Sequence, residues 1–389
     1  MRNPAIRTER RGGLARFVVV YAALYGAYGS LSPILPGFLA ERGLTPGQIG
    51  ALLAAAGALR LLVGPLAGSY ADRRRAGRGV LAASLVLAGS ATLAHLPAAG
   101  FLQLLGAGLA YGVGTAAPAP LADALTLAAA RGGAVFQYGW VRAAGSAAFI
   151  AATVAAGRVI EANGLAIPVV ASGVLFLAAA AAVLTLPIAP KVAAETGSSP
   201  WRGLASLIKR PRFRRTVAAA ALVIGAHAMH DGFAMILWRE SGIGAGTAGL
   251  LWSESVAAEV LIFLLVGPLL LGRIGLPAGV AVAACAGALR WIVLGSTTAI
   301  PWIAAVEALH GFSFALLHLA CLGLIEEATP ADLRATALAL YGTLGLGLSG
   351  VLATLASGSL YGAFGAKAFW AMAAISLAAL PLVPGLRRR

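Results

Sequence analysis

The chain has 389 residues, of which 60% are hydrophobic and only 11% are charged. A soluble protein this apolar could not cover its surface with polar side chains, so much of its apolar surface must face lipid. The formal net charge of +15 does not indicate a nucleic-acid-binding protein, because the basic residues lie in short gaps between apolar runs and form no patch on a polar domain. The composition therefore predicts a multi-pass membrane protein and excludes nucleic acid as a partner.

The first apolar run follows a basic N-terminus, as in a secretory signal peptide. The run that begins at Phe17 is long, however, and no small-residue cleavage site closes it. We therefore expect it to be retained as the first membrane span. The two cysteines, Cys285 and Cys321, lie inside apolar runs, so the sequence predicts neither a disulfide framework nor a metal site.

Twelve segments are long and apolar enough to span a membrane, since a helix needs about 20 residues to cross about 30 Å of hydrocarbon. The predicted spans are residues 15–40, 46–70, 78–97, 100–125, 137–160, 165–188, 215–240, 245–271, 276–296, 299–325, 333–361 and 364–385. The longest polar stretch falls between the sixth and the seventh. The predicted fold is therefore an all-α membrane protein with two pseudo-symmetric six-helix bundles, residues 1–188 and 214–389, joined by a cytoplasmic linker at 189–213.

The basic residues predict the orientation of the chain. Most of them lie on the side that carries both termini and the linker, which the positive-inside rule assigns to the cytoplasm. We expect a multi-pass protein of the cell inner (cytoplasmic) membrane with both termini cytoplasmic. Gly64-Pro65-Leu66 recurs as Gly267-Pro268-Leu269 at corresponding spans of the two halves, as parallel six-span repeats predict.

Ionisable groups at bilayer depth are the candidate functional residues, because a charge there costs at least a few kcal/mol and must face water or another such group. They are Arg60, Asp123, Arg142, His227, His230, Asp231, Glu254, Glu259, Arg290, Glu307, His310 and His318. Most of them lie in spans seven to ten. Each could singly be a structural ion pair, but the cluster favours a transport pathway.

Helical spacing orders the cluster. His227 and Asp231 are four residues apart and share a face, and Glu307, His310, Phe314 and His318 fall within about 80° of one another. Glu254 and Glu259 are separated by about 140°, so one straight helix cannot point both into the same cavity.

Glu259 is the better candidate for a buried proton carrier, since it lies near the middle of its span. Glu254 lies toward the outer side of the same span and is an alternative candidate for a residue at the entrance of the cavity. A carboxylate that gains and loses an arginine partner such as Arg290 can take up and release a proton.

No nucleotide-binding loop and no soluble domain is present, so the sequence excludes ATP-driven transport within this chain. An ion gradient remains, and buried carboxylates beside histidines favour protons over sodium. His227 and Asp231 could be read as metal ligands of a membrane enzyme, but no third ligand converges on them. We expect no enzyme activity, no cofactor and no bound metal.

The segment Gly68-Ser69-Tyr70-Ala71-Asp72-Arg73 after the second span resembles the signature of the major facilitator superfamily. The resemblance implies a conformational role for Gly68, Asp72 and Arg73, in which the aspartate pairs across the cytoplasmic face in one state and is released in the other. We place Arg60, in the same span, with these gating residues.

Longer strings resemble the phenylpropionate permease group, which is related to lactose permease and to proton-coupled nucleoside symporters. The matching strings, in order along nearly the whole chain, are Pro120-Leu121-Ala122-Asp123, Tyr138-Gly139-Trp140-Val141-Arg142, Ala226-His227-Ala228, Leu251-Trp252, Ala258-Glu259-Val260, Leu309-His310-Gly311 and His318-Leu319-Ala320. The resemblance implies that Asp123 and Arg142 form a substrate-binding pair and that Arg290 and His310 belong to a proton-coupling network.

The sequence departs from this group at three places. Ser313 stands where lactose permease has its proton-carrying glutamate, three residues after the histidine, and Glu307 lies three residues before it. Trp140 replaces a basic or small polar residue, and His230-Asp231 replaces an aromatic, uncharged pair.

The leading prediction is a proton-coupled symporter that imports a small organic solute by alternating access. The first candidate for the solute is an aromatic monocarboxylate such as 3-phenylpropionate. A nucleoside or sugar symporter and a drug or metabolite antiporter stay open as alternatives. The predicted substrate-binding residues are Asp123, Arg142, Trp140, His227 and His318. The predicted proton-coupling residues are Glu259, Arg290, His310, Asp231, Glu307 and Glu254. The partners are the solute, protons and membrane lipid, and the sequence predicts no oligomeric state.

Overall fold

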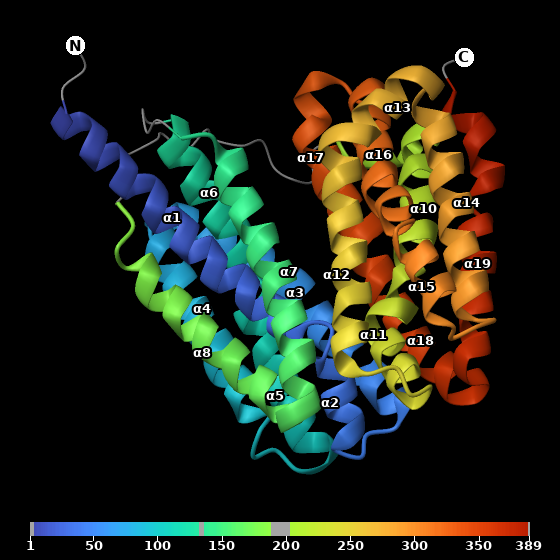
Figure 1. The fold of residues 1–389 in the computed structure, drawn as a ribbon. Coiled ribbons are helices and arrows are strands. Elements are labelled where there is room, and N and C mark those ends of the chain that lie inside the picture. The colour runs from blue at the N-terminus through green and yellow to red at the C-terminus, as the bar shows by residue number, and fades with distance from the viewer. Residues whose placement is uncertain (1–3, 132–135, 188–202, 388–389) are drawn as a thin grey trace. The chain divides into compact units, whose positions relative to one another are not determined.

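The computed structural model describes residues 4–131, 136–187 and 203–387 (Figure 1). Every regular element in this part of the chain is a helix. A helix satisfies its backbone donors and acceptors within one segment, which is what lipid requires of a chain this apolar.

Eleven helical stretches among the described residues are long and apolar enough to cross a membrane. Ten correspond to single predicted spans. The eleventh, Ala331–Leu386, has 56 residues, contains the predicted spans 333–361 and 364–385, and turns at Gly365, where φ is 54°. The all-α membrane fold is confirmed, and the stretches agree with twelve crossings.

The chain divides into two compact units. The first comprises Met1–Leu44 and Ala55–Glu195, and the second comprises Thr45–Ala54 and Thr196–Arg389. Of the predicted linker 189–213, residues 189–202 lie outside the described residues, and the remainder holds the short helix α9 (Leu204–Lys209) and the start of the next helix.

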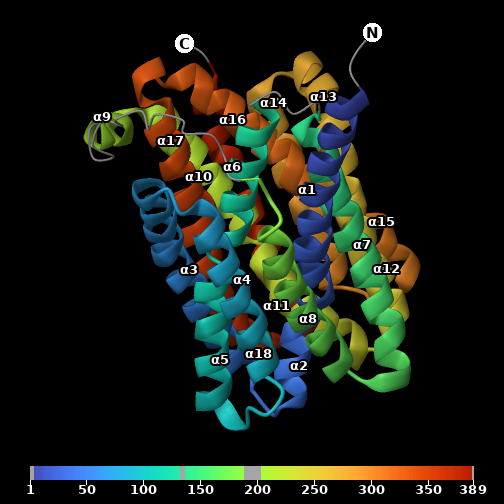
Figure 2. The same cartoon turned by 90° about the vertical axis from the view of Figure 1, so that its left-hand side faces the viewer.

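The helices of the first unit pack through α1, which lies along α7 and α8 in both views (Figures 1 and 2), while α4 lies against α5 and α8. A Cβ at Gly29 of α1 would collide with the backbone carbonyl of Phe149 in α7, so the two helices approach to backbone contact. The helices are α1 (Pro4–Leu31), α2 (Leu35–Glu41), α3 (Pro46–Arg74), α4 (Gly77–Ala94), α5 (Gly100–Gly114), α6 (Pro118–Arg131), α7 (Tyr138–Asn163) and α8 (Ala166–Val183). The start of α3, up to Ala54, belongs to the second unit.

The second unit is built around α10, α11 and α14, which pack against α16, α18 and α19 respectively. After α9, its helices are α10 (Pro211–Gly225), α11 (His227–Glu240), α12 (Ala245–Leu261), α13 (Gly267–Ile274), α14 (Leu276–Leu294), α15 (Ile300–Glu307), α16 (Leu317–Ala328), α17 (Arg334–Leu340), α18 (Ser349–Phe364) and α19 (Ala368–Leu377). Three short 3₁₀ turns, η3 (Ala331–Leu333), η5 (Gly365–Lys367) and η6 (Leu380–Leu386), complete it.

Three spans of the second unit change to π-helix near their middle. The segments are η1 (Ile262–Val266), η2 (Gly311–Leu316) and η4 (Tyr341–Leu348). A π-turn inserts an extra residue into the helical repeat and rotates the side chains that follow it, and such turns are frequent at functional sites. Helical-wheel spacing that crosses one of these segments is therefore altered.

Glycines in the left-handed region end two of the long helices. Gly164 (φ 75°) follows α7 and Gly275 (φ 81°) follows α13, and both positions need a residue without a Cβ penalty. Pro277 then occupies the first turn of α14, where its missing N–H leaves no intrahelical bond unmade.

Large apolar side chains lie exposed along the spans, including Leu66 (69%), Leu102 (79%) and Trp302 (63%). Surface of this kind is what a lipid-facing helix presents.

Candidate functional site

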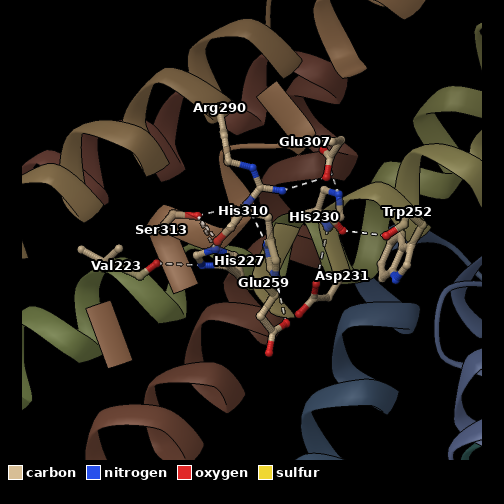
Figure 3. A network of polar contacts seen from close by, with 11 residues as sticks. Val223, His227, His230, Asp231, Trp252, Glu259, Arg290, Glu307, His310 and Ser313 are labelled. Carbon is tan, nitrogen blue, oxygen red and sulfur yellow. Dashed lines mark hydrogen bonds and ion pairs between the residues drawn. The ribbon is translucent and has the colours of Figure 1, made fainter. Parts of the chain in front are cut away.

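A buried ion pair lies at the centre of the second unit. Arg290 of α14 and Glu307 at the end of α15 are both 0% exposed, and Arg290 Nη2 donates to Glu307 Oε2 at 2.9 Å (Figure 3). Removing two charges from water costs several kcal/mol per ion, which only close mutual contact and further hydrogen bonds offset. The surrounding side chains supply those bonds.

The guanidinium of Arg290 contacts two further residues of the span that carries Glu307, which is formed by α15, η2 and α16. Its Nη1 lies 3.1 Å from His310 Nδ1 and donates to Ser313 Oγ at 3.3 Å. Because a guanidinium can only donate, His310 Nδ1 must accept, and the ring proton of His310 lies on Nε2.

His310 connects the ion pair to a partly exposed carboxylate. Its Nε2 lies 3.5 Å from Oε2 of Glu259 on α12, whose side chain is 34% exposed. The imidazole also stacks on Phe314, with ring centroids 5.4 Å apart. The proton on His310 therefore faces Glu259.

His230 of α11 connects Glu307 to a second exposed carboxylate. Its Nε2 lies 3.2 Å from Glu307 Oε1, an ion-pair distance at an angle that does not make a hydrogen bond, and its Nδ1 lies 3.5 Å from Asp231 Oδ1. Asp231 is 64% exposed, whereas His230 is 2% exposed and stacks on Trp252 at 4.7 Å.

His227, one turn earlier, completes the network from the other side. Its Nδ1 lies 3.0 Å from the carbonyl oxygen of Val223 and its Nε2 lies 3.0 Å from Ser313 Oγ. A carbonyl only accepts, so the proton of the neutral ring lies on Nδ1, and Nε2 accepts from the serine hydroxyl. Ser313 thus joins His227 to Arg290.

Close helix packing positions these groups. A Cβ at Gly311 would lie 2.5 Å from the carbonyl oxygen of Ala258, so η2 and α12 touch directly next to both His310 and Glu259. Ser313 lies within the π-turn that begins at Gly311.

A separate polar cluster lies in the first unit around Asp123 of α6. Tyr21 of α1 donates its hydroxyl to Asp123 Oδ1 at 2.5 Å, and Tyr138 of α7 donates to the same oxygen at 2.9 Å. Thr126 Oγ1 donates to the Tyr21 hydroxyl at 3.3 Å. Asp123 is therefore held by two phenols.

Arg142 and Trp140 of α7 are exposed. The guanidinium of Arg142 lies over the ring of Tyr25, 4.5 Å from its centroid, in a cation–π contact. The resemblance implied a pairing of Arg142 with Asp123. In this structure the Asp123 carboxylate accepts hydrogen bonds from two tyrosines, and Arg142 stacks on a third.

The second unit brings together five of the six predicted proton-coupling residues, namely Glu259, Arg290, His310, Asp231 and Glu307. Arg290 pairs with Glu307, and not with Glu259 as the sequence suggested, because His310 lies between Arg290 and Glu259. Glu254 lies half-buried on α12, five residues before Glu259, without a histidine contact in the described part of the chain.

Two further histidines of the predicted substrate-binding set, His227 and His318, have their own polar contacts. His227 is 3% exposed and bonds Ser313, while its neighbour His230 contacts Asp231. His318 follows the π-turn, and its Nδ1 lies 2.9 Å from the Tyr341 hydroxyl, while its ring lies beside that of Phe263 of η1, with the centroids 6.1 Å apart.

The signature residues lie at the end of α3. Asp72 and Arg73 are exposed, Gly68 has open space around it, and Arg60 is exposed farther up the same helix. Among the described residues the Asp72 carboxylate has no side-chain partner.

Sequence reasoning missed the tyrosines of α1. Tyr21, Tyr25 and Tyr28 follow one another at four and three residues and form a ring-to-ring series. This i, i+4, i+7 spacing on one helical face is a signal that could have found them.

The chain is similar to known transporters over nearly its whole length. The model of the MFS_1 like family matches residues 14–372. The chain is 30% identical over 373 residues, 94% of this chain and 95% of the relative, to the "Probable 3-phenylpropionic acid transporter" of Escherichia coli (strain K12). It is 27% identical over 347 residues, 88% of this chain and 86% of the relative, to "Maltose permease" of Geobacillus stearothermophilus.

Solved structures share the fold. The nucleoside transporter NupG matches with a TM-score of 0.84 at 17% identity over 96% of this chain and 98% of that chain. A bacterial homologue of the lysosomal transporter Spinster matches with a TM-score of 0.74 at 14% identity over 97% and 96%.

Proposed function

This chain belongs to the MFS_1 like family, whose relatives are multi-pass membrane transporters and not enzymes, and from this premise we propose that it is a proton-coupled symporter for a small aromatic monocarboxylate. The proposal has two parts, the coupling ion and the solute, and different residues support each.

Proton coupling is supported by one observation above the others, the contact between Glu259 and His310. The carboxylate is 34% exposed and so meets water, while the histidine beside it is fixed by Arg290 with its single proton directed at Glu259. Protons from water can reach the Glu259 carboxylate, and its partner His310 contacts the buried Arg290. Protonation of Glu259 can therefore change the charge balance of the buried network. We assign a transported proton to Glu259.

An aromatic carboxylate is supported by the first unit. Arg142 offers an exposed guanidinium, which binds a carboxylate through two parallel hydrogen bonds, and Tyr25 lies directly beside it with an aromatic surface. The 30% identity to a protein named as a probable 3-phenylpropionic acid transporter favours the same class. Trp140, His227 and His318 remain further candidates for contact with the solute.

The location and gate belong to the same proposal. We place the protein in the cytoplasmic membrane with both termini and the linker 189–213 inside, on the distribution of basic residues. Gly68, Asp72, Arg73 and Arg60 are the proposed gating residues of the first unit.

Uptake into proteoliposomes tests both parts. Purified protein with an inward pH gradient is expected to accumulate labelled 3-phenylpropionate, and unlabelled aromatic acids are expected to compete while uridine and maltose do not. Competition by uridine or maltose alone would move the solute to the nucleoside or sugar class. Gradient-driven efflux would make the protein an antiporter.

A matched pair of variants tests the carrier. Glu259→Gln is expected to retain exchange of labelled for unlabelled 3-phenylpropionate and to lower accumulation driven by the pH gradient. Glu326→Gln removes a carboxylate of the same unit that lies exposed at the end of α16 beside Arg334, and it is expected to behave like the parent. Parental accumulation by Glu259→Gln would exclude Glu259 as carrier.

A further inference from the structure

We propose that the buried network contains two separate proton-binding arms, divided by Arg290, and that each transport cycle moves two protons. The Glu259 arm is Glu259 with His310. The Asp231 arm is Asp231 with His230 and Glu307. The stoichiometry rests on the proposed function, whereas the division into two arms is a property of the protein alone.

Each arm has the same order of groups from water inward. Asp231 and Glu259 both lie on the side of the network away from Arg290 (Figure 3). Their side chains are 64% and 34% exposed, and each contacts one histidine at 3.5 Å. A carboxylate at bilayer depth does not face lipid, so each arm ends in a group that water can reach.

The two histidines differ in the protons that they can hold. Both ring nitrogens of His230 face carboxylate oxygens, those of Asp231 and Glu307, so a doubly protonated ring satisfies both. His310 has a guanidinium at Nδ1, so only its Nε2 can carry a proton while that contact lasts.

Arg290 separates the arms. Its Nη2 donates to Glu307, the inner end of the Asp231 arm, and its Nη1 donates to His310, the inner end of the Glu259 arm. A guanidinium keeps its protons throughout the accessible pH range, so it cannot pass a proton from one arm to the other. The arms therefore share the charge of Arg290, and the guanidinium relays no proton between them.

Other charged and titratable groups lie near His230 or on helices packed against α11, among which α10 carries Arg212, Arg214 and Arg215 in its first turns. Glu307 faces it directly, Arg290 and His310 lie behind Glu307, and His227 lies one turn earlier on α11. On α12, Trp252 stacks on the ring and Glu254 lies one half-turn beyond. The Tyr361 hydroxyl of α18 donates to Glu240, at the far end of α11, and α19 contains no titratable side chain.

Histidine NMR tests the division without any solute. The chain has only five histidines, so ¹⁵N-histidine labelling with single His→Gln variants assigns each ring. His310 is expected to show one protonated nitrogen and His230 two. Asp231→Asn is expected to change the pH titration of His230 more than that of His310, and Glu259→Gln is expected to do the reverse. A variant that shifts both rings equally would overturn the two-arm division.

The zero-flux point of transport tests the stoichiometry. In proteoliposomes at zero membrane potential, a tenfold gradient of 3-phenylpropionate balances a pH difference of about 0.5 unit for two protons and about 1 unit for one, because a tenfold ratio and one pH unit carry the same free energy. The flux of protein-free vesicles is subtracted to remove passive permeation.

The parent is expected to balance at about 0.5 unit, and both Asp231→Asn and Glu259→Gln at about 1 unit, as mass action requires for two protons and for one. The double variant is expected to exchange solute with no response to pH. Glu326→Gln should match the parent. A parent that balances at about 1 unit, or an unchanged balance in Asp231→Asn, would overturn the second proton and leave the symport proposal intact. Absence of 3-phenylpropionate flux in the parent would contradict the proposed solute and, with it, the stoichiometry, while the NMR result would still decide the two arms.

Discussion

Arg290 joins three residues of the polar network. It is 0% exposed and makes polar contacts with Glu307, His310 and Ser313. Its planar fork reaches partners in different directions, which a single ammonium cannot do. The stability of the second unit should therefore depend on the guanidinium and not on its charge alone.

Arg290→Lys is expected to lower the unfolding free energy by about 3 kcal/mol, since it leaves a buried carboxylate imperfectly paired. Thermal unfolding in detergent measures the change. Arg273→Lys, at an exposed position at the end of α13, serves as the control and is expected to unfold at the parental temperature. Equal unfolding temperatures for the two variants would show that the fork is dispensable.

Arg142 is the corresponding test in the first unit. Arg142→Lys keeps the charge but loses the planar fork and the stacking on Tyr25. We expect uptake of 3-phenylpropionate to fall by about tenfold or more, as the loss of one charge-assisted hydrogen bond of about 1.5–3 kcal/mol implies. Near-parental uptake would argue against a bidentate contact with the solute carboxylate.

The residues of the network could be predicted from the sequence, but their pairing could not. Ionisable groups stand out against apolar spans, so Arg290, Glu307 and His310 were found as candidates. Which carboxylate contacts Arg290 depends on side-chain geometry between separate helices. The spacing of residues along the sequence does not reveal that His310 lies between Arg290 and Glu259. Tyr21, which donates a hydrogen bond to Asp123, carries no charge, so a selection of charged and histidine side chains at bilayer depth does not include it.

At the scale of helices, glycines determine how closely the spans approach. Gly29 brings α1 against the backbone of α7, and Gly311 brings η2 against α12. Both contacts leave no room for a Cβ, so their substitution should act through displacement of a whole helix.

Gly29→Ala is expected to reduce the unfolding free energy by about 1–3 kcal/mol through overpacking. Gly106→Ala provides the control, because no atom lies within 4 Å of a Cβ at that position of α5 and alanine has the higher helix propensity. Thermal unfolding should separate the two variants, with Gly106→Ala at or above the parent. Unfolding of Gly29→Ala at the parental temperature would contradict a tight α1–α7 contact.

Gly311→Ala is expected to impair coupling more than stability, since it displaces α12 beside Glu259. Exchange of 3-phenylpropionate should persist while accumulation driven by a pH gradient falls. If accumulation and exchange declined together, the contact would be structural only.

The positions of the spans could be predicted from composition, because a long apolar run is a strong signal. The changes from α-helix to π-helix within a span could not. The π-turn in η2 begins at Gly311, and glycine there is equally compatible with an ordinary helix.

At the scale of the whole chain, the number and length of the apolar runs predict the all-α membrane fold, and short sequence motifs along the chain predict the family. The orientation in the membrane stays a prediction. It rests on the distribution of basic residues along the sequence.

Cysteine labelling tests that orientation. Ser198→Cys, in a chain with Cys285 and Cys321 replaced, is expected to react with an impermeant thiol reagent only after the membrane is opened. Reaction in intact cells would place the linker outside and invert the topology.

Proton movement driven by solute tests the central claim most directly. Proteoliposomes with a pH-sensitive dye inside and equal pH on both sides are exposed to 3-phenylpropionate, and protein-free vesicles record passive entry of the acid. The account predicts that the lumen acidifies faster with the parent protein than in protein-free vesicles, and that Glu259→Gln reduces the difference. Acidification at the protein-free rate in vesicles that demonstrably exchange the solute would contradict proton-coupled symport.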